Sequence, residues 1–276
     1  ISCSANRLEQ FNRSINSIYH QSNRLKEVEL LVLNDGEGKG IYDILSSYTG
    51  RFLIRFFEIY KRKHSVSQVA TRRNFLARKA RGKILLITDP EVVHYSETIS
   101  QVIQNIKING EYTWYCGKIF GMSNFVNSKG IMMNYYKDNI DPSDLMCLGT
   151  RGNRHKKIDL DYFKKCKRFH LLNADKFPET MFCTAISAKY FAKARGFNEK
   201  MLYWGFDDID LFNRMKKLGT ERIYDSQFIV YHLPHTTNLD SISKLGWNIY
   251  NANLKFRNTD HWGYSISNQV KEIKID

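Results

Sequence analysis

Two clusters of acidic residues lie far apart in the chain, and each follows a hydrophobic segment. The first, in ILLITDPE at 84–91, places Asp89 and Glu91 directly after a run of aliphatic side chains. Pro90 favours an extended backbone between them, and side chains two residues apart on an extended segment point to the same side. Both carboxylates would then face one hard cation or its water shell. Because Asp-Pro is also a common turn opening, a polar loop that closes a strand is the alternative.

The second cluster lies in WGFDDIDLFNRMKKLG at 204–219. Asp207 and Asp208 fall at the start of an expected helix, where capping and the helix dipole favour acidic residues, and Asp210 and Arg214 have i, i+4 spacing. The neighbouring aromatic residues are Tyr203, Trp204 and Phe206. A carboxylate beside an aromatic ring also suits a sugar, because the ring stacks on the apolar sugar face while the carboxylate accepts a hydroxyl proton. A capped helix and a sugar site are both open interpretations.

Two histidines, His232 and His235, follow the apolar segment FIVY. A histidine at the end of a strand is commonly a structural residue. A neutral imidazole could also complete a metal site with Glu91, since histidine is a frequent ligand of divalent metals.

Composition and charge limit the classes of protein and partner. With 276 residues, 42% of them hydrophobic, the chain can bury the core of one large domain or of a domain with a subdomain. The net charge of +14 favours anionic partners: nucleotide, nucleic acid, phosphorylated polymer or membrane surface. The five scattered cysteines include no CxxC pair, which argues for a reducing compartment and against a disulfide framework or zinc cluster. We therefore expect a cytoplasmic protein, with the inner face of a membrane as an alternative location.

The apolar periodicity predicts an α/β fold with a mostly parallel sheet covered by helices on both faces. Strands are expected at 1–5, 28–33, 51–57, 84–88, 112–120 and 228–231, and another at the start of 181–197. Helices are expected at 8–19, 40–48, 67–81 and 93–107, before Gly196, and from 207 to Gly219. In such sheets ligands bind at the carboxyl ends of the strands, which is where Asp35 and Asp89 fall. The polar, basic residues 122–170 are expected to form an insertion or mobile loop.

The order and spacing of these segments resemble the GT-A glycosyltransferases, closest to the inverting, nucleotide-sugar-dependent enzymes of family 2. The resemblance covers most of residues 1–235. Its parts are the opening strand that ends in Asn6-Arg7, VLNDG at 32–36, RRNFLARKARGKILLITDPE at 72–91, WGFDDIDLFNRMKKLG, and YHLPH at 231–235. It implies a Rossmann-like single large domain with a mixed, mostly parallel sheet.

The resemblance also implies roles for individual residues. Asp208 matches the catalytic base, and Asp207 beside it orients the acceptor. The metal ligands would be Asp89 and Glu91 at the family's DxD position, together with His232 or its neighbour His235. The residues implied in donor binding are Ala5, Asn6, Arg7, Asp35, Arg73, Asn74 and Asp89. The residues implied in acceptor binding are Trp204, Gly205 and Phe206.

The same resemblance suggests an organisation and a reaction. Residues 1–121 would bind the nucleotide-sugar donor, 171–238 would form the acceptor and catalytic half, and 239–276 would form a C-terminal helix and loose tail. The sugar, from a UDP-sugar as the expected donor, would pass with inversion to a hydroxyl of a glycan or anionic polymer, DNA included, with Mn²⁺ or Mg²⁺ on the diphosphate.

Two alternatives belong to other classes. One is a non-catalytic nucleic-acid-binding protein, in which the positive charge is the main feature and the aspartates only cap helices. The other is a metal-dependent nucleotidyltransferase on a similar sheet. The basic segment 61–83 has three possible roles. It could be a solvated helix face, it could neutralise a diphosphate, or, together with 151–157, it could form a docking surface for an anionic acceptor.

Overall fold

The first half of the chain folds by alternating strands and helices, as the sequence predicts. A computed structural model describes residues 1–3, 7–21, 25–35, 40–60, 69–95, 97–121, 124–126, 132–134, 183–201, 207–233, 236–238, 248–249, 251–253 and 256–275. The first elements are β1 (Ser2–Cys3), α1 (Leu8–Tyr19), the 3-10 turn Leu25–Glu27, β2 (Glu29–Asn34), α2 (Ile41–Ser46), β3 (Leu53–Ile59), α3 (Val69–Lys79) and β4 (Ile84–Thr88).

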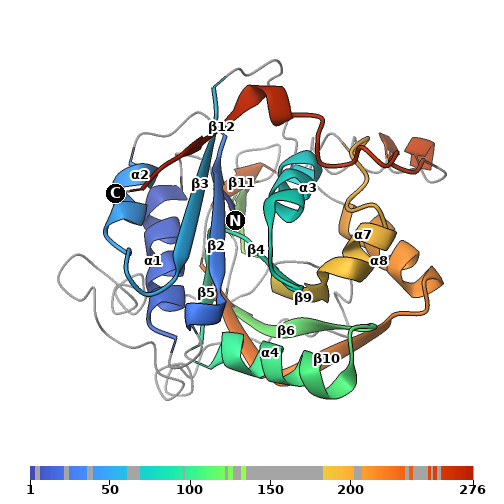
Figure 1. Ribbon diagram of the computed structural model, residues 1–276, viewed down its shortest axis with the longest axis horizontal. Helices are drawn as coiled ribbons and strands as arrows, with labels where there is room; N and C mark the ends of the chain where they lie inside the picture. The colour runs from blue at the N-terminus through green and yellow to red at the C-terminus, as the bar shows by residue number, and fades with distance from the viewer. Residues whose placement is uncertain are drawn as a thin grey trace.

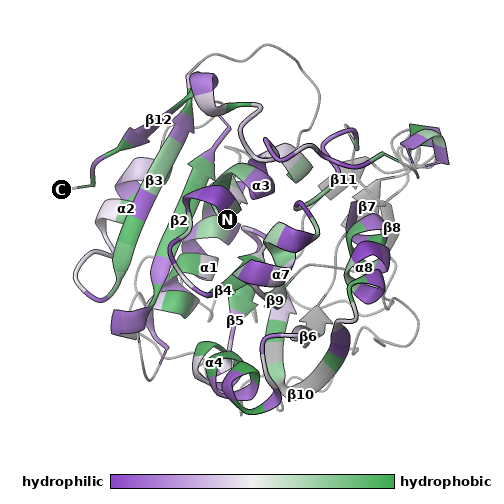
Figure 2. Ribbon diagram, turned by 45° about the vertical axis from the view of Figure 1, so that its right-hand side comes forward, coloured by the Kyte–Doolittle hydropathy of each residue, from purple (hydrophilic) through white to green (hydrophobic). Residues whose placement is uncertain are grey.

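The first sheet has the strand order β1-β2-β3-β12, with α1 and α2 on one side and α3 on the other (Figure 1). The strands β1, β2 and β3 are parallel, and both faces are buried. Alternation along β2 therefore serves two cores: Leu30 and Val32 pack in the cluster of α1 and α2, whereas Leu31 and Leu33 pack in the cluster of α3. Figure 2 accordingly shows β2 and β3 as largely hydrophobic.

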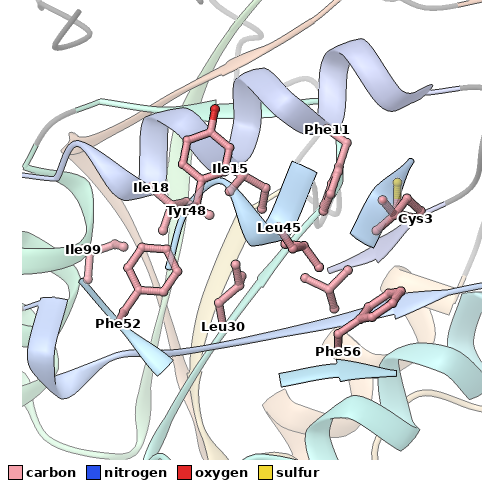
Figure 3. Packing of buried hydrophobic residues seen from close by; sticks show 12 residues of the cluster. Cys3, Phe11, Ile15, Ile18, Leu30, Leu45, Tyr48, Phe52, Phe56 and Ile99 are labelled. Carbon is pink, nitrogen blue, oxygen red and sulfur yellow. The ribbon is translucent and has the colours of Figure 1, made fainter. Parts of the chain in front are cut away.

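The core between this sheet and α1 and α2 is filled by large side chains (Figure 3). Phe11 and Ile15 of α1 and Leu45 of α2 have no solvent exposure, and they pack with Leu30 and Phe56 of the sheet. This packing holds the strands whose carboxyl ends carry the first polar residues of the site.

A second sheet has the strand order β4-β9-β6-β10-β5. Its further elements are β5 (Val92–His94), β6 (Thr113–Gly121), β9 (Cys183–Ser187) and β10 (Glu221–His232), with the helices α4 (Thr98–Asn109), α7 (Ala188–Lys193) and α8 (Asp207–Lys217). The helix α4 covers one face, while α7 and α8 cover the other. Trp114 of β6 stacks on Phe212 of α8 with ring centroids 4.5 Å apart, which fixes α8 against the sheet.

The α/β class and the covering by helices are confirmed, but the sheets are more mixed than the sequence predicts. In the second sheet β6 and β10 are parallel, whereas β4, β5 and β9 each run antiparallel to their neighbours. The helix expected at 93–107 begins only at Thr98, because the buried residues Val92 and Val93 pair with β10 as strand β5. β-Branched side chains suit such a strand.

The tail differs from the expected loose end. After helical residues at 251–253, it crosses the body and ends in the 3-10 turn Ser267–Gln269 and β12 (Val270–Ile273), which pairs antiparallel with the edge strand β3. Val270 and Ile273 pack against the two core clusters on opposite faces of the sheet. Pairing at an edge depends on a distant partner, so local periodicity does not reveal it.

The expected insertion at 122–170 lies mostly outside the described residues. Within it, β7 (Asn124–Val126) and β8 (Met132–Asn134) form a small third sheet with β11 (Thr236–Asn238). In the part of the chain that the structure describes, no helix has both the length and the apolar character needed to cross a bilayer.

The packing of α2 gives a test of the first core. Leu45→Ala removes a fully buried side chain and should lower the free energy of unfolding by about 2–5 kcal/mol, measured by urea denaturation. The matched control Leu53→Ala truncates a half-exposed leucine of β3 and should change stability by less than about 0.5 kcal/mol. Equal losses in the two variants would contradict this description of the core.

Candidate active site

The guanidinium of Arg73 brings the two acidic clusters together. Its Nη2 lies 2.6 Å from Oδ1 of Asp89, and its Nη1 lies 3.4 Å from Oδ2 of Asp207 and 3.5 Å from Oδ1 of Asp208. Arg73 belongs to α3, Asp89 follows β4, and the other two aspartates open α8. Segments that the sequence presents separately therefore form one polar centre.

The start of α8 separates the aspartates by role. Asp210 pairs with Arg214 one turn later, at 2.6 Å, and both side chains are buried. This ion pair stays within the helix, so Asp210 is a structural residue. Asp207 and Asp208 instead face Arg73, and the side chain of Asp208 is 25% exposed against 10% for Asp207. Asp208 is thus the more accessible of the two to an incoming molecule.

Burial and charge act against each other in this centre. Burial raises the pKa of Asp207 above its ordinary value, although the nearby Arg73 acts in the opposite direction. For Arg73 burial disfavours the charged form, but Asp89, Asp208 and Asp207 together raise its pKa. When ionised, the three carboxylates exceed the charge of the guanidinium by two units, a local excess that favours a cation.

Glu91 occupies a second, deeper position. Its Oε1 accepts a hydrogen bond from Nη1 of Arg7 and lies 3.6 Å from Nε2 of His232. The side chains of Glu91 and His232 are almost fully buried. The amide of Leu233 donates to the carbonyl of Glu91 at 2.8 Å, and this bond joins the end of β10 to the loop after β4.

The backbone between the first two carboxylates is a turn rather than the extended segment that the sequence suggests. The amide of Val92 donates to the carbonyl of Asp89 at 3.2 Å, which closes a turn around Pro90. The ring of Pro90 fixes a φ that suits the second position of a turn as well as an extended chain. Asp89 and Glu91 consequently meet different partners, Arg73 and Arg7.

Asp35 forms the third part of the site, at the end of β2. It is buried, and its Oδ2 lies 2.8 Å from Nη1 of Arg72, the neighbour of Arg73 on α3. Its amide donates to the carbonyl of Cys3 on the adjacent strand. Burial raises the pKa of the Cys3 thiol to about 12, and the charges of Glu91 and Asp35 act in the same direction.

Asn74 does not face this polar centre. It is fully buried, and its amide group exchanges hydrogen bonds with the backbone of Phe197: Nδ2 donates to the carbonyl and Oδ1 accepts from the amide, both at 2.8 Å. These contacts give Asn74 a packing role, while its expected part in donor binding stays a prediction.

Six residues expected at the site lie outside the described residues. They are Ala5, Asn6, Trp204, Gly205, Phe206 and His235. Conversely, Arg72 was not expected as a site residue, because its partner Asp35 lies 37 positions earlier and no local spacing links the two. The signals in the sequence are the adjacency of two arginines and the position of Arg72 in the basic segment 61–83.

The carboxylate and imidazole groups of the site are of the chemical types that bind a hard divalent cation. Carboxylates and an imidazole are common ligands of Mn²⁺ and Mg²⁺ sites, and Glu91 and His232 already lie near one another. Among the described residues, however, no three acidic, histidine or cysteine side chains converge tightly enough to define such a site. Arg7 and His232 both lie at Oε1 of Glu91, so a cation on that oxygen would have to compete with Arg7.

Two sequence-family models together match most of the chain. A model of glycosyl transferase family 2 matches residues 1–184, and a model described as the N-terminal domain of galactosyltransferase matches residues 179–236. The two matches meet between the acidic clusters, so each cluster lies within one of them. Among curated proteins, none matches the sequence.

Solved structures show the same fold at low identity. They include a Pyrobaculum calidifontis mannosyltransferase in complex with GDP-Man and Mn²⁺, at 13% identity and a TM-score of 0.52 over 84% of this chain and 56% of that one. GalNAc-T7 with UDP, GalNAc and Mn²⁺ has 12% identity and a TM-score of 0.53, over 81% of this chain and 40% of that one. Residues 1–349 of S. aureus TarS, in complex with UDP, have 13% identity and a TM-score of 0.55, over 97% of this chain and 72% of that one. The fold is therefore GT-A, and the chain spans about half the length of the first two.

The raised pKa of Asp207 predicts a pH dependence of stability. A carboxyl group with a higher pKa in the folded than in the unfolded protein favours folding at low pH, and this contribution is lost as pH rises past its ordinary value of about 4. Asp207→Asn removes the titration. The free energy of unfolding of this variant should therefore increase relative to the wild type between about pH 4 and pH 8, measured by urea denaturation.

The control for this experiment is Leu53→Ala, which truncates a half-exposed side chain and removes no titratable group. Its difference from the wild type should not change over the same range. A stability difference for Asp207→Asn that falls with rising pH would contradict the dominance of burial at this position.

Proposed function

Because the chain belongs to glycosyltransferase family 2, we propose that it transfers a sugar from a nucleotide-diphosphate donor to an acceptor hydroxyl with inversion. The family match covers residues 1–184 of 276, and the GT-A fold carries both acidic clusters. The observation that supports the proposal most directly is the contact of Arg73 with Asp89 on one side and with Asp207 and Asp208 on the other. It joins the donor side of the site to the acceptor side.

Asp208 acts as the general base in this proposal. It is the more exposed of the paired aspartates, and a carboxylate can remove the proton of an acceptor hydroxyl as that oxygen attacks the sugar. Attack from the face opposite the departing diphosphate inverts the anomeric centre. Arg73 holds the carboxylate in place, and the buried Asp207 orients the acceptor beside it.

The donor lies on the side of Asp35, Arg72 and Asp89. Asp35 follows β2 and Asp89 follows β4, at the carboxyl ends of strands, where ligands bind in open α/β sheets. Arg7 and Arg72 are paired with carboxylates in this structure and provide positive charge close to an incoming diphosphate. A UDP-sugar is the proposed donor, and TarS, GalNAc-T7 and the mannosyltransferase were solved with UDP, UDP and GDP-Man respectively.

A divalent cation completes the proposed donor site. Glu91, Asp89 and His232 would hold Mn²⁺ or Mg²⁺, which when bound would offset the charge that develops on the leaving diphosphate. The excess negative charge around Arg73 supports this assignment, as does the Mn²⁺ in two of the similar structures. His232, whose Nε2 lies 3.6 Å from Oε1 of Glu91, is the proposed histidine ligand.

The acceptor is proposed to be a glycan or another anionic polymer. A net charge of +14 favours such a partner, and phosphate contacts would make its binding weaken steeply with salt. Family membership disfavours the non-catalytic nucleic-acid-binding alternative. A nucleotidyltransferase would release pyrophosphate from its substrate, so the identity of the released product separates it from a glycosyltransferase.

Donor binding is the first test. Nucleotide sugars, with UDP-sugars first, should raise the melting temperature in the presence of Mn²⁺, and EDTA should remove most of the increase. Glu91→Gln should weaken the effect of Mn²⁺, while the surface variant Glu111→Gln should retain it. If no nucleotide sugar stabilises the wild type with metal present, the proposed function is wrong.

Asp208→Asn tests the catalytic step. Loss of a general base should lower the rate of nucleoside diphosphate release by about 10²- to 10⁴-fold, because this is what base assistance typically contributes. Donor affinity, measured by calorimetry, should change little. Asp43→Asn provides the matched control, since Asp43 also lies in the first turn of a helix but is exposed on α2. Loss of donor affinity together with activity would make Asp208 a donor ligand or a structural residue.

A further inference from the structure

The turn that follows α7, residues 194–199, contacts three separate elements and is called the junction turn below. It touches α3, which carries Arg73, and α8, which carries Asp207 and Asp208. It also touches the C-terminal segment 256–266, called the strap. The junction turn therefore lies where the two acid-bearing halves of the site and the tail are joined.

The contact with α3 is made by Asn74, directly after Arg73. Its side chain exchanges two hydrogen bonds with the backbone of Phe197, as in a sheet pair, and Nδ2 also donates to Oε1 of Glu199 at 3.0 Å. The guanidinium of Arg73 lies 5.3 Å from the centre of the Phe197 ring. The direction of Arg73 is thus tied to the junction turn through its neighbour and through this ring.

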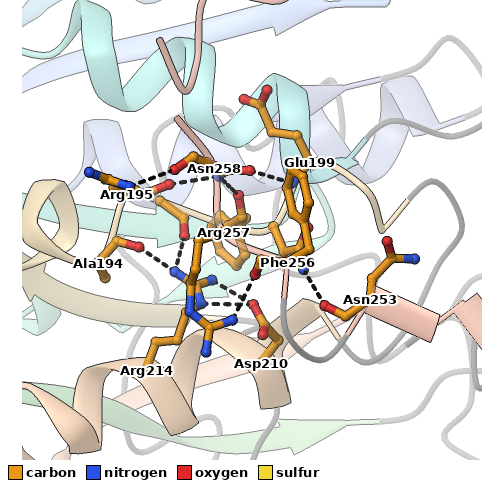
Figure 4. Close-up of polar contacts among 12 residues, drawn as sticks. Ala194, Arg195, Glu199, Asp210, Arg214, Asn253, Phe256, Arg257 and Asn258 are labelled. Carbon is orange, nitrogen blue, oxygen red and sulfur yellow. Dashed lines mark hydrogen bonds and ion pairs between the residues drawn. The ribbon is translucent and has the colours of Figure 1, made fainter. Parts of the chain in front are cut away.

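The contact with α8 is made by Arg214 (Figure 4). Its Nη1 donates to the carbonyl of Gly196 at 2.7 Å and to that of Ala194, while Asp210 holds the rest of the guanidinium. Through this residue the junction turn also sets the position of α8. The first turn of that helix contains Asp207 and Asp208.

The strap closes the junction turn from the other side (Figure 4). Asn258 donates through Nδ2 to the carbonyls of Arg195, at 2.7 Å, and Phe197, and it accepts from the amide of Glu199. Oε1 of Glu199 accepts from the amide of Gly263 at 2.7 Å, and its Oε2 accepts from Ser265 at 3.0 Å. Glu199 therefore receives bonds from both α3 and the strap.

The strap lies so close to α3 that its packing leaves little freedom. Arg78 of α3 donates to the carbonyl of Trp262 at 2.9 Å and lies 4.0 Å from the centre of its ring. Gly263 has a φ of +78°, and a Cβ there would come within 2.7 Å of the carbonyl oxygen of Asn74. Such a contact is closer than real Cβ atoms approach, so the strap needs glycine to reach this backbone.

We propose that Glu199 is a positioning residue for the reaction, and that the strap is part of the support that sets Arg73 opposite Asp208. The carboxylate of Glu199 accepts hydrogen bonds from Asn74 on α3 and from Gly263 and Ser265 of the strap. Within the part of the chain that the structure describes, these partners all lie outside the polar centre. The inference rests on the proposed function for its catalytic consequence. Its structural part, the coupling of the strap to α3 and α8, stands separately.

The test compares Glu199→Ala, Glu199→Gln and the wild type. In Glu199→Ala, hydrogen exchange should become faster in α3 and in the first turn of α8 but not in α1, which packs in a different core. The rate of transfer at saturating substrate should fall on the order of 10- to 100-fold, because small displacements of catalytic groups are costly. Donor affinity should stay within about threefold.

Rescue distinguishes positioning from a general loss of stability. Glu199→Gln keeps an oxygen for Asn74 and Gly263 and an amide for Ser265, so it should restore both exchange protection and rate. The surface control Glu111→Ala removes an exposed partner of Lys189 and should behave as the wild type. If Glu199→Ala does not fold, Glu199→Asp, which is one methylene shorter, should give the same local pattern.

Unchanged exchange in α3 and α8 for a folded Glu199→Ala or Glu199→Asp protein would overturn the coupling. Faster exchange with an unchanged transfer rate would overturn the positioning role. A wild type that binds no nucleotide sugar would instead refute the proposed function, and the exchange data would still decide the structural part.

Discussion

The site depends on the ion pairs of one largely buried arginine, Arg73. Moving the guanidinium of Arg73 out of water is costly unless charges compensate for it, and here Asp89 and the paired aspartates of α8 do so. The carboxylates need the arginine for the same reason. Each side compensates for the charge of the other, so the rest of the fold must bring together α3, the loop after β4 and the start of α8.

The elements around the site could largely be predicted from the sequence, but their contacts could not. Apolar periodicity indicates α1, β2 and β4, and the aspartates at the start of α8 follow from the preference for acid there. The strand β5 and the turn at Pro90 depend on pairing with β10, a distant segment. Arg73 and Asp207 are separated by 134 residues, and no local pattern links them. The family resemblance names Arg73 among the expected donor-binding residues, but its contacts with both acidic clusters became clear only in the structure.

Polar residues of the same type, or next to one another in the sequence, have different roles in the structure. Asp208 and Asp210 lie two positions apart in the first turn of α8, but Asp210 is buried in an ion pair within the helix, while Asp208 is partly exposed at the centre of the site. Arg73 and Asn74 are adjacent, but the first faces the carboxylates and the second packs on the junction turn. Geometry relative to the neighbouring segments decides which side chains are available to a ligand.

The pairing of β12 with β3 has a consequence for synthesis of the chain. Arg55 of β3 forms its ion pair with Glu272 of β12 across a sequence separation of 217 residues. During translation β1, β2 and β3 can form early, but the edge of β3 stays open until residues 270–273 have emerged from the ribosome. An open edge can pair with another chain, so the nascent protein passes through a period in which aggregation competes with completion of its first sheet.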